Sequence, residues 1–256
     1  MHSVGLIDTH CHLDAVEFDA DRGQVIARAL DAGVTTIVVP AITQANFAKV
    51  IRLGHEQPGC LAALGLHPMY IHAHQPAHLA MLRADIELHQ PLAVGEIGLD
   101  FFVPNLDVAT QEYYFIEQLK IARDFELPVL LHSRRANDQI LKQLRRLGIR
   151  RGISHAFNGS RQQADALIRQ GFKLGFGGAM TYSRALNLRR LASELPLHAI
   201  VLETDAPDMS PCWVRSQRNS PEQLPRIAGV LAEMRGVTLD EIVLATTNNA
   251  RTVFTL

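Results

Sequence analysis

Short apolar runs alternate with segments of helical periodicity along the whole chain. Runs of β-branched and other apolar residues predict eight β-strands, at Gly5–Asp8, Thr35–Pro40, Leu61–Leu66, Leu92–Glu96, Val129–His132, Gly152–His155, Lys173–Phe176 and Ile200–Glu203. Between the strands, apolar residues recur at helical spacing, as at Ile140, Leu141, Leu144 and Leu147. Eight strand-then-helix units predict an α/β fold, a TIM-like (β/α)8 barrel. A doubly wound open sheet is the structural alternative, because a strand count can err by one.

Length and composition agree with a single barrel domain. The chain has 256 residues, and a (β/α)8 barrel takes about 250, so we expect one domain over residues 1–256. Hydrophobic residues make up 47% and charged residues 20%, which is typical of a globular protein and excludes wholesale disorder. The 25 basic and 26 acidic residues give a net charge of −1, so any recognition of phosphate must be local.

The sequence carries no recognisable export or membrane signal. The N-terminus lacks a basic segment followed by an apolar one, and no apolar stretch approaches the roughly 18 residues of a membrane span. The three cysteines are widely spaced and form no C-x-x-C pair, so no disulfide framework is indicated. We expect a cytoplasmic, monomeric protein that does not associate with a membrane.

Polar side chains interrupt the apolar runs where the predicted strands end. Six of them are histidines or acids of the kind that bind metals, namely His10, His12, Glu96, His132, His155 and Asp205. Barrel enzymes carry their chemistry at the C-terminal ends of their strands. We therefore predict that these six residues hold two divalent metal cations.

His10 and His12 lie at alternate positions of the first predicted strand end. Because side chains alternate along a strand, both imidazoles face the same side and can reach one ion. Asp205 follows the eighth predicted strand, which neighbours the first in a barrel. It can ligate the same ion and accept the proton of a bound water. A core or surface histidine pair is the alternative without a function.

Glu96 ends the fourth predicted strand, where flanking glycines allow close approach of backbone or ligand. A carboxylate at this place can bridge two cations. Related barrels can use a carbamylated lysine as the bridge, but no lysine ends a predicted strand here; the lysines are Lys49, Lys120, Lys142 and Lys173. Glu96 is therefore the predicted bridge, and a salt bridge at the rim is the alternative.

Four further candidates follow apolar strands. His132 and His155 each end such a strand, and a hydrogen-bonded core histidine is the alternative for either alone. Glu203 shares its strand face with Asp205; we expect it to orient a ligating histidine, with direct ligation as the alternative. His67 either donates a hydrogen bond to a substrate oxygen, as a catalytic residue, or is structural.

Three residues are candidate phosphate contacts. Arg134 follows the strand that ends at His132, Asn158 precedes a predicted helix, and Arg218 lies in the loop after Asp205. Guanidinium groups and the N–H groups of a helix start both bind phosphate. For each arginine a solvated surface role is the alternative.

Seven motifs in order resemble those of the TatD family of metal-dependent hydrolases, within the amidohydrolase superfamily. They are Asp8-Thr-His-Cys-His12-Leu, Gly65-Leu-His-Pro68, Gly95-Glu-Ile-Gly-Leu-Asp100, His132-Ser-Arg134, Ser154-His-Ala-Phe-Asn-Gly-Ser160, Glu203-Thr-Asp-Ala-Pro207 and Asn248-Asn-Ala-Arg-Thr-Val-Phe254. Together they cover almost the whole chain. Many family members have Cys and Ser where this chain has Ala156 and Asn158, and an acid where it has Ser220; these differences bear on substrate preference.

The resemblance implies a TIM-like barrel with a binuclear divalent site and, in several family members, metal-dependent deoxyribonuclease activity. By position, His10 and His12 hold the first ion with Asp205, Glu96 bridges, and His132 and His155 hold the second. Zinc suits the histidine-rich ligands, and the mixed set also accepts manganese or magnesium.

Two bridged cations favour hydrolysis, especially of phosphate esters. We predict a phosphodiesterase or deoxyribonuclease that acts on DNA, short oligonucleotides or another phosphoester. The same centre also suits hydrolysis of a small-molecule C–N, lactone or aminoacyl ester bond. A non-catalytic metal-binding scaffold is a second alternative, disfavoured because a scaffold needs no proton acceptor such as Asp205.

Overall fold

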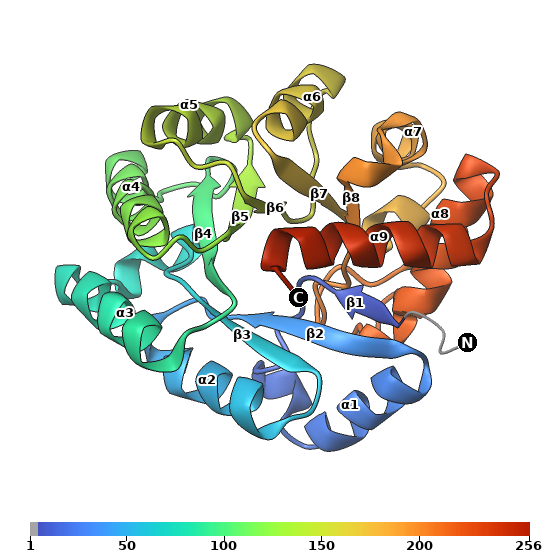
Figure 1. Ribbon diagram of the computed structural model, residues 1–256, viewed down its shortest axis with the longest axis horizontal. Coiled ribbons are helices and arrows are strands. Elements are labelled where there is room, and N and C mark those ends of the chain that lie inside the picture. Colours follow the sequence, from blue (N-terminus) through green and yellow to red (C-terminus); the bar gives the residue numbers. More distant parts are fainter. Residues whose placement is uncertain (1–4) are drawn as a thin grey trace. The chain divides into compact units, whose positions relative to one another are not determined.

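The computed structural model describes residues 5–256 and shows strands that alternate with helices, with two consecutive α-helices after the last strand (Figure 1). The strands are β1 (Leu6–Asp8), β2 (Val34–Pro40), β3 (Cys60–Leu64), β4 (Ala93–Asp100), β5 (Val129–Arg134), β6 (Gly152–Ser154), β7 (Phe172–Phe176) and β8 (Ile200–Leu202). They are parallel and follow one another in the sheet order β1 to β8. This topology confirms the predicted (β/α)8 fold class, and all eight predicted strands overlap an observed one.

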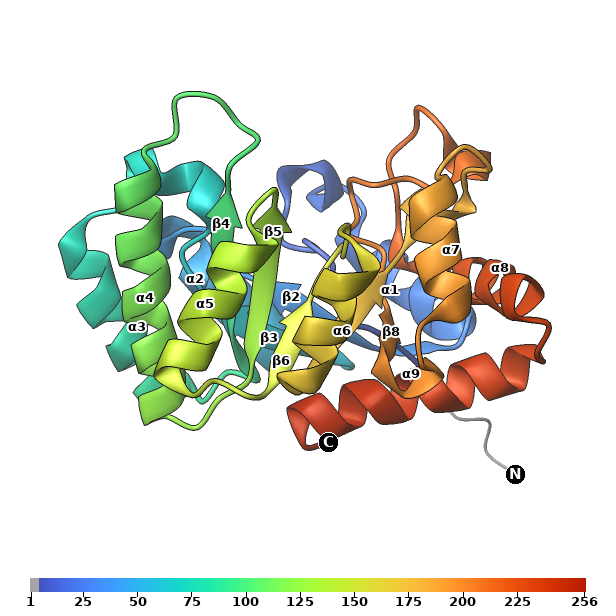
Figure 2. The same ribbon diagram turned by 90° about the horizontal axis from the view of Figure 1, so that it is seen from above.

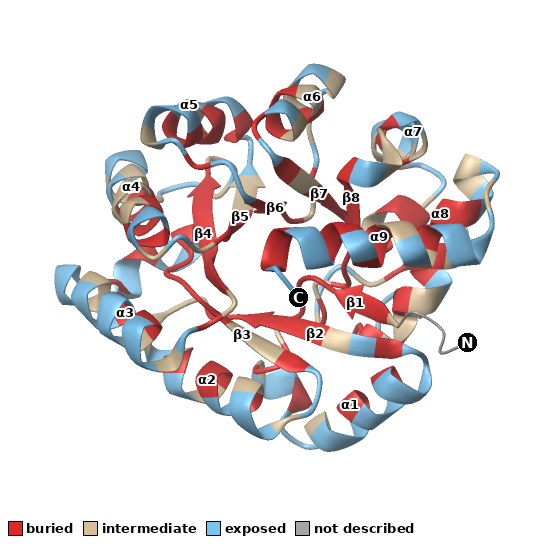
Figure 3. Cartoon of the chain, in the orientation of Figure 1, coloured by how far each residue is buried: buried red, intermediate tan, exposed pale blue. Residues whose placement is uncertain are grey.

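Nine α-helices lie within residues 5–256. They are α1 (Arg22–Asp31), α2 (Phe47–Glu56), α3 (Pro76–His89), α4 (Val108–Asp124), α5 (Asn137–Leu147), α6 (Arg161–Arg169), α7 (Leu186–Glu194), α8 (Leu224–Arg235) and α9 (Leu239–Phe254). Their inner faces are buried while their outer faces are exposed (Figure 3), which is the amphipathic pattern that the helical spacing predicted. None of these helices combines the length and apolar character needed to span a membrane.

Internal contacts divide the chain into two compact units. Unit 1 comprises the described part of Met1–Val39 together with Lys173–Leu256, and unit 2 comprises Pro40–Phe172. The single domain over residues 1–256 therefore stays a prediction.

In unit 1, β8 runs beside β1, since the backbone N–H of Thr9 donates to the carbonyl of Leu202 over 3.1 Å. Helix α9 contacts both strands (Figure 1). The Asn249 amide donates to the carbonyls of Leu197 (2.8 Å) and Ile200 (2.7 Å), at the start of β8. The helix therefore packs at the N-terminal ends of these strands, and the residues that follow their C-terminal ends are clear of it.

In unit 2, the strand β4 continues four residues beyond its predicted end at Glu96, and every one of its residues is buried. Gly98 makes this possible: its φ is +153°, and a Cβ there would lie 1.9 Å from the carbonyl oxygen of His132. Only glycine permits such an approach. As a result β4 pairs with β5 as far as Asp100, which lies opposite Arg134.

Candidate metal centre

Unit 1 brings together two histidines and one acid, which we call the His10 cluster (His10, His12, Asp205). The Nε2 atoms of His10 and His12 lie 3.3 Å apart. Oδ1 of Asp205 is 3.7 Å from Nε2 of His10 and 3.6 Å from Nε2 of His12. The two imidazoles therefore lie on one side, as expected, although both residues follow the end of β1 at Asp8. The His10 side chain is fully buried, whereas that of Asp205 keeps 14% of its surface exposed.

The backbone holds Asp205 in an unusual conformation. Its φ is +54°, a left-handed value that costs a non-glycine residue about 1–3 kcal/mol. Its N–H donates to the carbonyl of His10 over 2.8 Å, which fixes the residue beside the end of β1. The strain is thus compensated by a hydrogen bond that places the carboxylate next to both imidazoles.

The buried side chain of Asp8 connects the two segments that carry the cluster. Its fully buried carboxylate accepts hydrogen bonds from the backbone N–H of His10 (3.3 Å) and from the N–H (2.9 Å) and hydroxyl (2.5 Å) of Thr204. Burial raises the pKa of Asp8 to about 8, although these hydrogen bonds oppose the rise. Asp8 therefore joins the segment that carries His10 to the segment that carries Asp205.

Unit 2 gathers three imidazoles around one carboxylate oxygen, an arrangement that we call the Glu96 cluster (His67, Glu96, His132, His155). Oε1 of Glu96 lies 3.1 Å from Nε2 of His67, 3.0 Å from Nδ1 of His132 and 2.9 Å from Nε2 of His155. Glu96 has 2% of its side-chain surface exposed. A buried carboxylate is costly unless it is paired, so these contacts account for its presence.

The tautomer of His67 follows from its second nitrogen. Nδ1 accepts a hydrogen bond from the backbone N–H of Met69 (3.1 Å), so in the neutral ring Nε2 carries the proton and donates to Glu96. The buried His74 donates from Nε2 to the carbonyl of His67 over 2.9 Å, and burial lowers the pKa of His74. In this structure His67 therefore acts on Glu96; its predicted contact with a substrate oxygen stays a prediction.

The acid that sequence reasoning missed is Asp100. Its Oδ2 lies 3.0 Å from Nε2 of His132. Burial opposes ionisation of both groups, yet their hydrogen bonds outweigh it: the pKa of Asp100 falls to about 2 and that of His132 is raised. The prediction ended the strand at Glu96 and so left Asp100 outside. Even spacing between Glu96 and Asp100 was the available signal, because it puts both carboxylates on one strand face.

Glu203 follows β8 and is 1% exposed. Its carboxylate lies against Gly175 of β7, where an added Cβ would meet Oε2 at 2.2 Å. The side chain thus occupies space that only a glycine leaves open. Its predicted role in orienting a histidine stays a prediction.

The three candidate phosphate contacts have different surroundings. Arg134 is exposed, and its guanidinium carbon lies 3.8 Å from the ring centroid of Phe102. Asn158 is exposed before α6, and its carbonyl accepts from the Asn137 amide over 3.3 Å. Arg218 instead pairs with Asp21, through two hydrogen bonds of 2.8 and 2.7 Å. Of the two arginines, Arg134 is therefore the more available.

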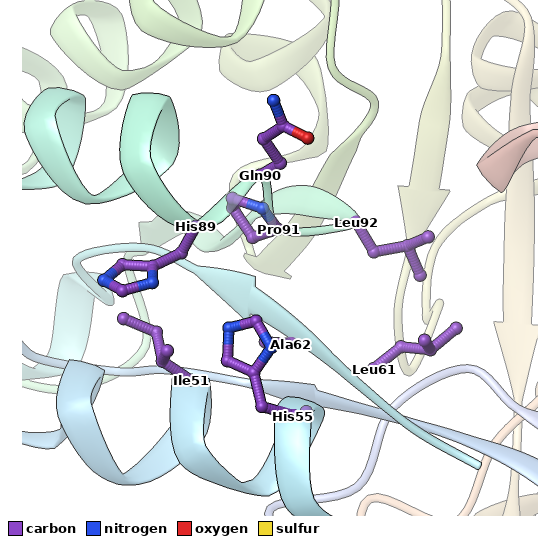
Figure 4. Close-up of a pocket in the computed structure, with 9 residues that line it drawn as sticks. Ile51, His55, Leu61, Ala62, His89, Gln90, Pro91 and Leu92 are labelled. Carbon is purple, nitrogen blue, oxygen red and sulfur yellow. The ribbon is translucent and has the colours of Figure 1, made fainter. Parts of the chain in front are cut away.

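A separate pocket of unit 2 lies at the opposite strand ends (Figure 4). It is lined by the C-terminal parts of α2 and α3 and by residues near the starts of β3 and β4. The rings of His55 and His89 meet there edge to face, with centroids 5.9 Å apart. No carboxylate lines this pocket, which distinguishes the pair from both metal-type clusters.

Both clusters have donors that fit divalent cations. Within unit 2, ligand atoms of His67, Glu96 and His132 lie within 4.8 Å of one another. In unit 1, two imidazole nitrogens and a carboxylate oxygen converge at 3.3–3.7 Å. Mixed imidazole and carboxylate sets bind zinc and manganese in hydrolases.

Comparison with known proteins identifies relatives over nearly the full length. A family model described as "TatD related DNase" matches residues 7–255. An uncharacterized metal-dependent hydrolase of Escherichia coli K12, YjjV, is 43% identical over 251 residues, 97% of each chain. A protein of Pantoea vagans named 3'-5' ssDNA/RNA exonuclease TatD is 33% identical over 98% of this chain and all of its own. The crystal structure of E. coli YjjV, a TatD homologue, superposes with a TM-score of 0.95 at 42% identity, covering 98% of both chains.

Proposed function

This chain belongs to the TatD family and is a metal-dependent hydrolase; from that premise we propose that it hydrolyses phosphodiester bonds of DNA or short oligonucleotides. The observation that carries the proposal is the Glu96 cluster, in which three imidazoles surround one buried carboxylate oxygen. The name of the exonuclease from P. vagans supports the choice of substrate.

We assign two divalent cations to the two clusters, zinc first, with manganese or magnesium as the other candidates. His10, His12 and Asp205 would hold one ion, His132 and His155 would hold the other, and Glu96 would serve as the bridging ligand. When bound, such cations activate water and neutralise charge on phosphate oxygens. Support comes from the family and from the donor set of each cluster.

The protein side chains have distinct tasks in this proposal. Asp205 accepts the proton of the attacking water, for which its partial exposure is suitable. Asp100 orients His132, and His67 orients Glu96, through the hydrogen bonds described above. Glu203 orients a ligating histidine.

Substrate contacts complete the proposal. Arg134 and Asn158 bind phosphate oxygens, while Arg218 does so only after it leaves Asp21. We propose that one monomeric domain, residues 1–256, carries the activity in the cytoplasm, and that other phosphoesters are additional substrates.

The test is turnover of a single-stranded oligonucleotide and of bis-nitrophenyl phosphate by metal-loaded protein. Asp205→Asn should reduce turnover at least 100-fold, because the proton acceptor is lost. Asp208→Asn is the matched control, since it alters an exposed aspartate three residues away. Equal turnover by the Asp205 variant and the unaltered protein would refute the proposal, as would turnover of lactone, C–N or aminoacyl ester substrates alone.

A further inference from the structure

An exposed aromatic ring lies against two arginines close to the Glu96 cluster. Phe102 is 45% exposed, in the loop between β4 and α4, and this loop extends beyond the C-terminal end of β4 (Figure 2). The guanidinium carbon of Arg134 lies 3.8 Å from the ring centroid, and that of Arg135 lies 4.7 Å from it. We call these three residues the Phe102 platform.

One carboxylate connects the platform to the Glu96 cluster. Oδ1 of Asp100 accepts hydrogen bonds from the backbone N–H groups of Phe102 (2.9 Å) and Val103 (3.0 Å). Oδ2 of the same residue pairs with His132. Arg134 is the last residue of β5, two positions beyond His132. The platform is therefore built onto the same two strand ends as the candidate metal ligands.

The two arginines of the platform have no acidic partner within residues 5–256. Their guanidinium groups have neither an ion pair nor a side-chain hydrogen bond in that part of the chain. Arg83 provides the contrast: it also lies over a phenyl ring, that of Phe125 at 5.4 Å, but it pairs with Asp124 over 2.5 Å. A guanidinium that lies over an aromatic ring without an acidic partner keeps N–H groups available, and these suit phosphate oxygens.

The backbone of Arg135 adds an independent observation. Its φ is +56°, a left-handed value that is unfavourable for a residue with a Cβ. Such conformations concentrate at ligand-binding and active sites, where the surrounding structure maintains them. Here the conformation turns the chain directly after β5 and brings a second guanidinium to the ring.

We infer that the Phe102 platform binds one nucleotide of a single-stranded nucleic acid, stacking its base and holding its phosphates. Bases of single strands stack on aromatic rings and on guanidinium planes, whereas in a duplex the base faces are already covered. The platform thereby makes the site selective for single strands. This inference rests on the proposed phosphodiester substrate and identifies which part of that substrate is recognised.

Two ligands separate base stacking from phosphate binding. Oligo-dT and an abasic deoxyribose-phosphate strand of equal length carry the same phosphates, but only the first has bases. Binding is measured by fluorescence anisotropy with metal-loaded protein carrying Asp205→Asn, so that cleavage does not interfere. Phe102→Leu should weaken binding of oligo-dT about 5- to 50-fold and leave the abasic strand within 2-fold.

The arginine variant has a different expected signature. Arg135→Gln should weaken both strands and reduce the slope of log K against log salt by about 0.7, the value for one phosphate contact on a single strand. Two variants serve as controls. Tyr113→Leu removes a ring that is 47% exposed and has no arginine over it among residues 5–256. Arg83→Gln removes an arginine that already pairs with an acid, Asp124. Both should bind like the parent protein.

The outcomes distinguish this inference from the proposed function. If Phe102→Leu binds both strands like the controls, or if the parent protein binds neither strand, the inference is overturned. Binding through Phe102 without turnover of any phosphodiester by the unaltered protein would overturn the proposed function alone. If the unaltered protein hydrolyses phosphodiesters but the platform variants bind both strands like the controls, only the inference is overturned.

Discussion

Nε2 of His132 lies 3.0 Å from Oδ2 of Asp100, while its Nδ1 faces Glu96 at the same distance. The imidazole is therefore held between two carboxylates, one of them a candidate metal ligand. With its pKa at about 2, Asp100 stays ionised above pH 4 and accepts a hydrogen bond from the Nε2–H group of His132 throughout that range. A carboxylate in this position fixes both the orientation and the tautomer of the ring.

We predict that Asp100→Asn lowers metal affinity or kcat/KM about 10- to 100-fold without unfolding the protein. The amide can still accept from Phe102 and Val103 through its oxygen, but it presents an NH2 group to His132. Metal titration and kinetics between pH 5 and 8 would measure the loss. Asp107→Asn is the control, because Asp107 caps α4 through Thr110 and pairs with no histidine among residues 5–256; a similar loss there would contradict the assignment.

Gly175 provides a test of Glu203. Gly175→Ala would force the buried carboxylate to move, because the new Cβ would overlap Oε2. If Glu203 orients a ligating histidine, activity should fall about 10-fold or more. Gly229→Ala, in open space within α8, should instead raise the free energy of unfolding by about 0.5–1 kcal/mol with unchanged activity. Full activity of the Gly175 variant would show that the carboxylate has no such role.

The pair between Asp21 and Arg218 predicts a pH-dependent contribution to stability. Hydrogen bonds from Arg218 hold the pKa of Asp21 below its ordinary value of 3.8. A carboxyl group with a lowered pKa stabilises the fold fully above pH 3.8, and this contribution is lost as the pH falls through the lowered pKa.

Asp21→Asn should therefore lower the free energy of unfolding at pH 7, and the difference from the unaltered protein should shrink below pH 3.8. Urea denaturation at several pH values would measure it. Asp31→Asn, at an exposed position, should cause no such change. A difference that grows on acidification would mean that the pair is not the source.

Metal removal should destabilise the protein as well as inactivate it. A ligand that binds only the folded state adds about 2.7 kcal/mol when its concentration is 100 times Kd, so chelation should lower the Tm by about 5–10 °C. Metal addition should restore both Tm and activity. Thermal unfolding with and without chelator measures the shift.

His55→Gln combined with His89→Gln removes two histidines that meet at 5.9 Å without a carboxylate, and its response to chelator should be unchanged. His10→Gln should lose most of the response. If the His55/His89 double variant loses its response to chelator and His10→Gln keeps it, our assignment of the metal to the His10 cluster is wrong.

Local patterns in the sequence were sufficient for the fold class and for most cluster members. Strand periodicity located all eight strands, because each is a short apolar run between helical segments. Alternation at the end of the first predicted strand indicated that His10 and His12 share one side. Their Nε2 atoms do lie 3.3 Å apart, although β1 itself ends at Asp8. These relationships depend only on residues that are close together in the chain, so they can be predicted from the sequence.

Relationships between distant residues were decided only by the tertiary structure. The end of β4 depended on how closely Gly98 approaches β5, and with it the contact between Asp100 and His132. Likewise, Arg134 and Arg218 are both arginines that follow strand ends in the sequence. In the structure the guanidinium of Arg134 lies over the ring of Phe102, whereas that of Arg218 pairs with Asp21, 197 positions away. Sequence spacing determines which way a side chain points from its own strand, whereas the partner that it meets depends on packing between separate elements.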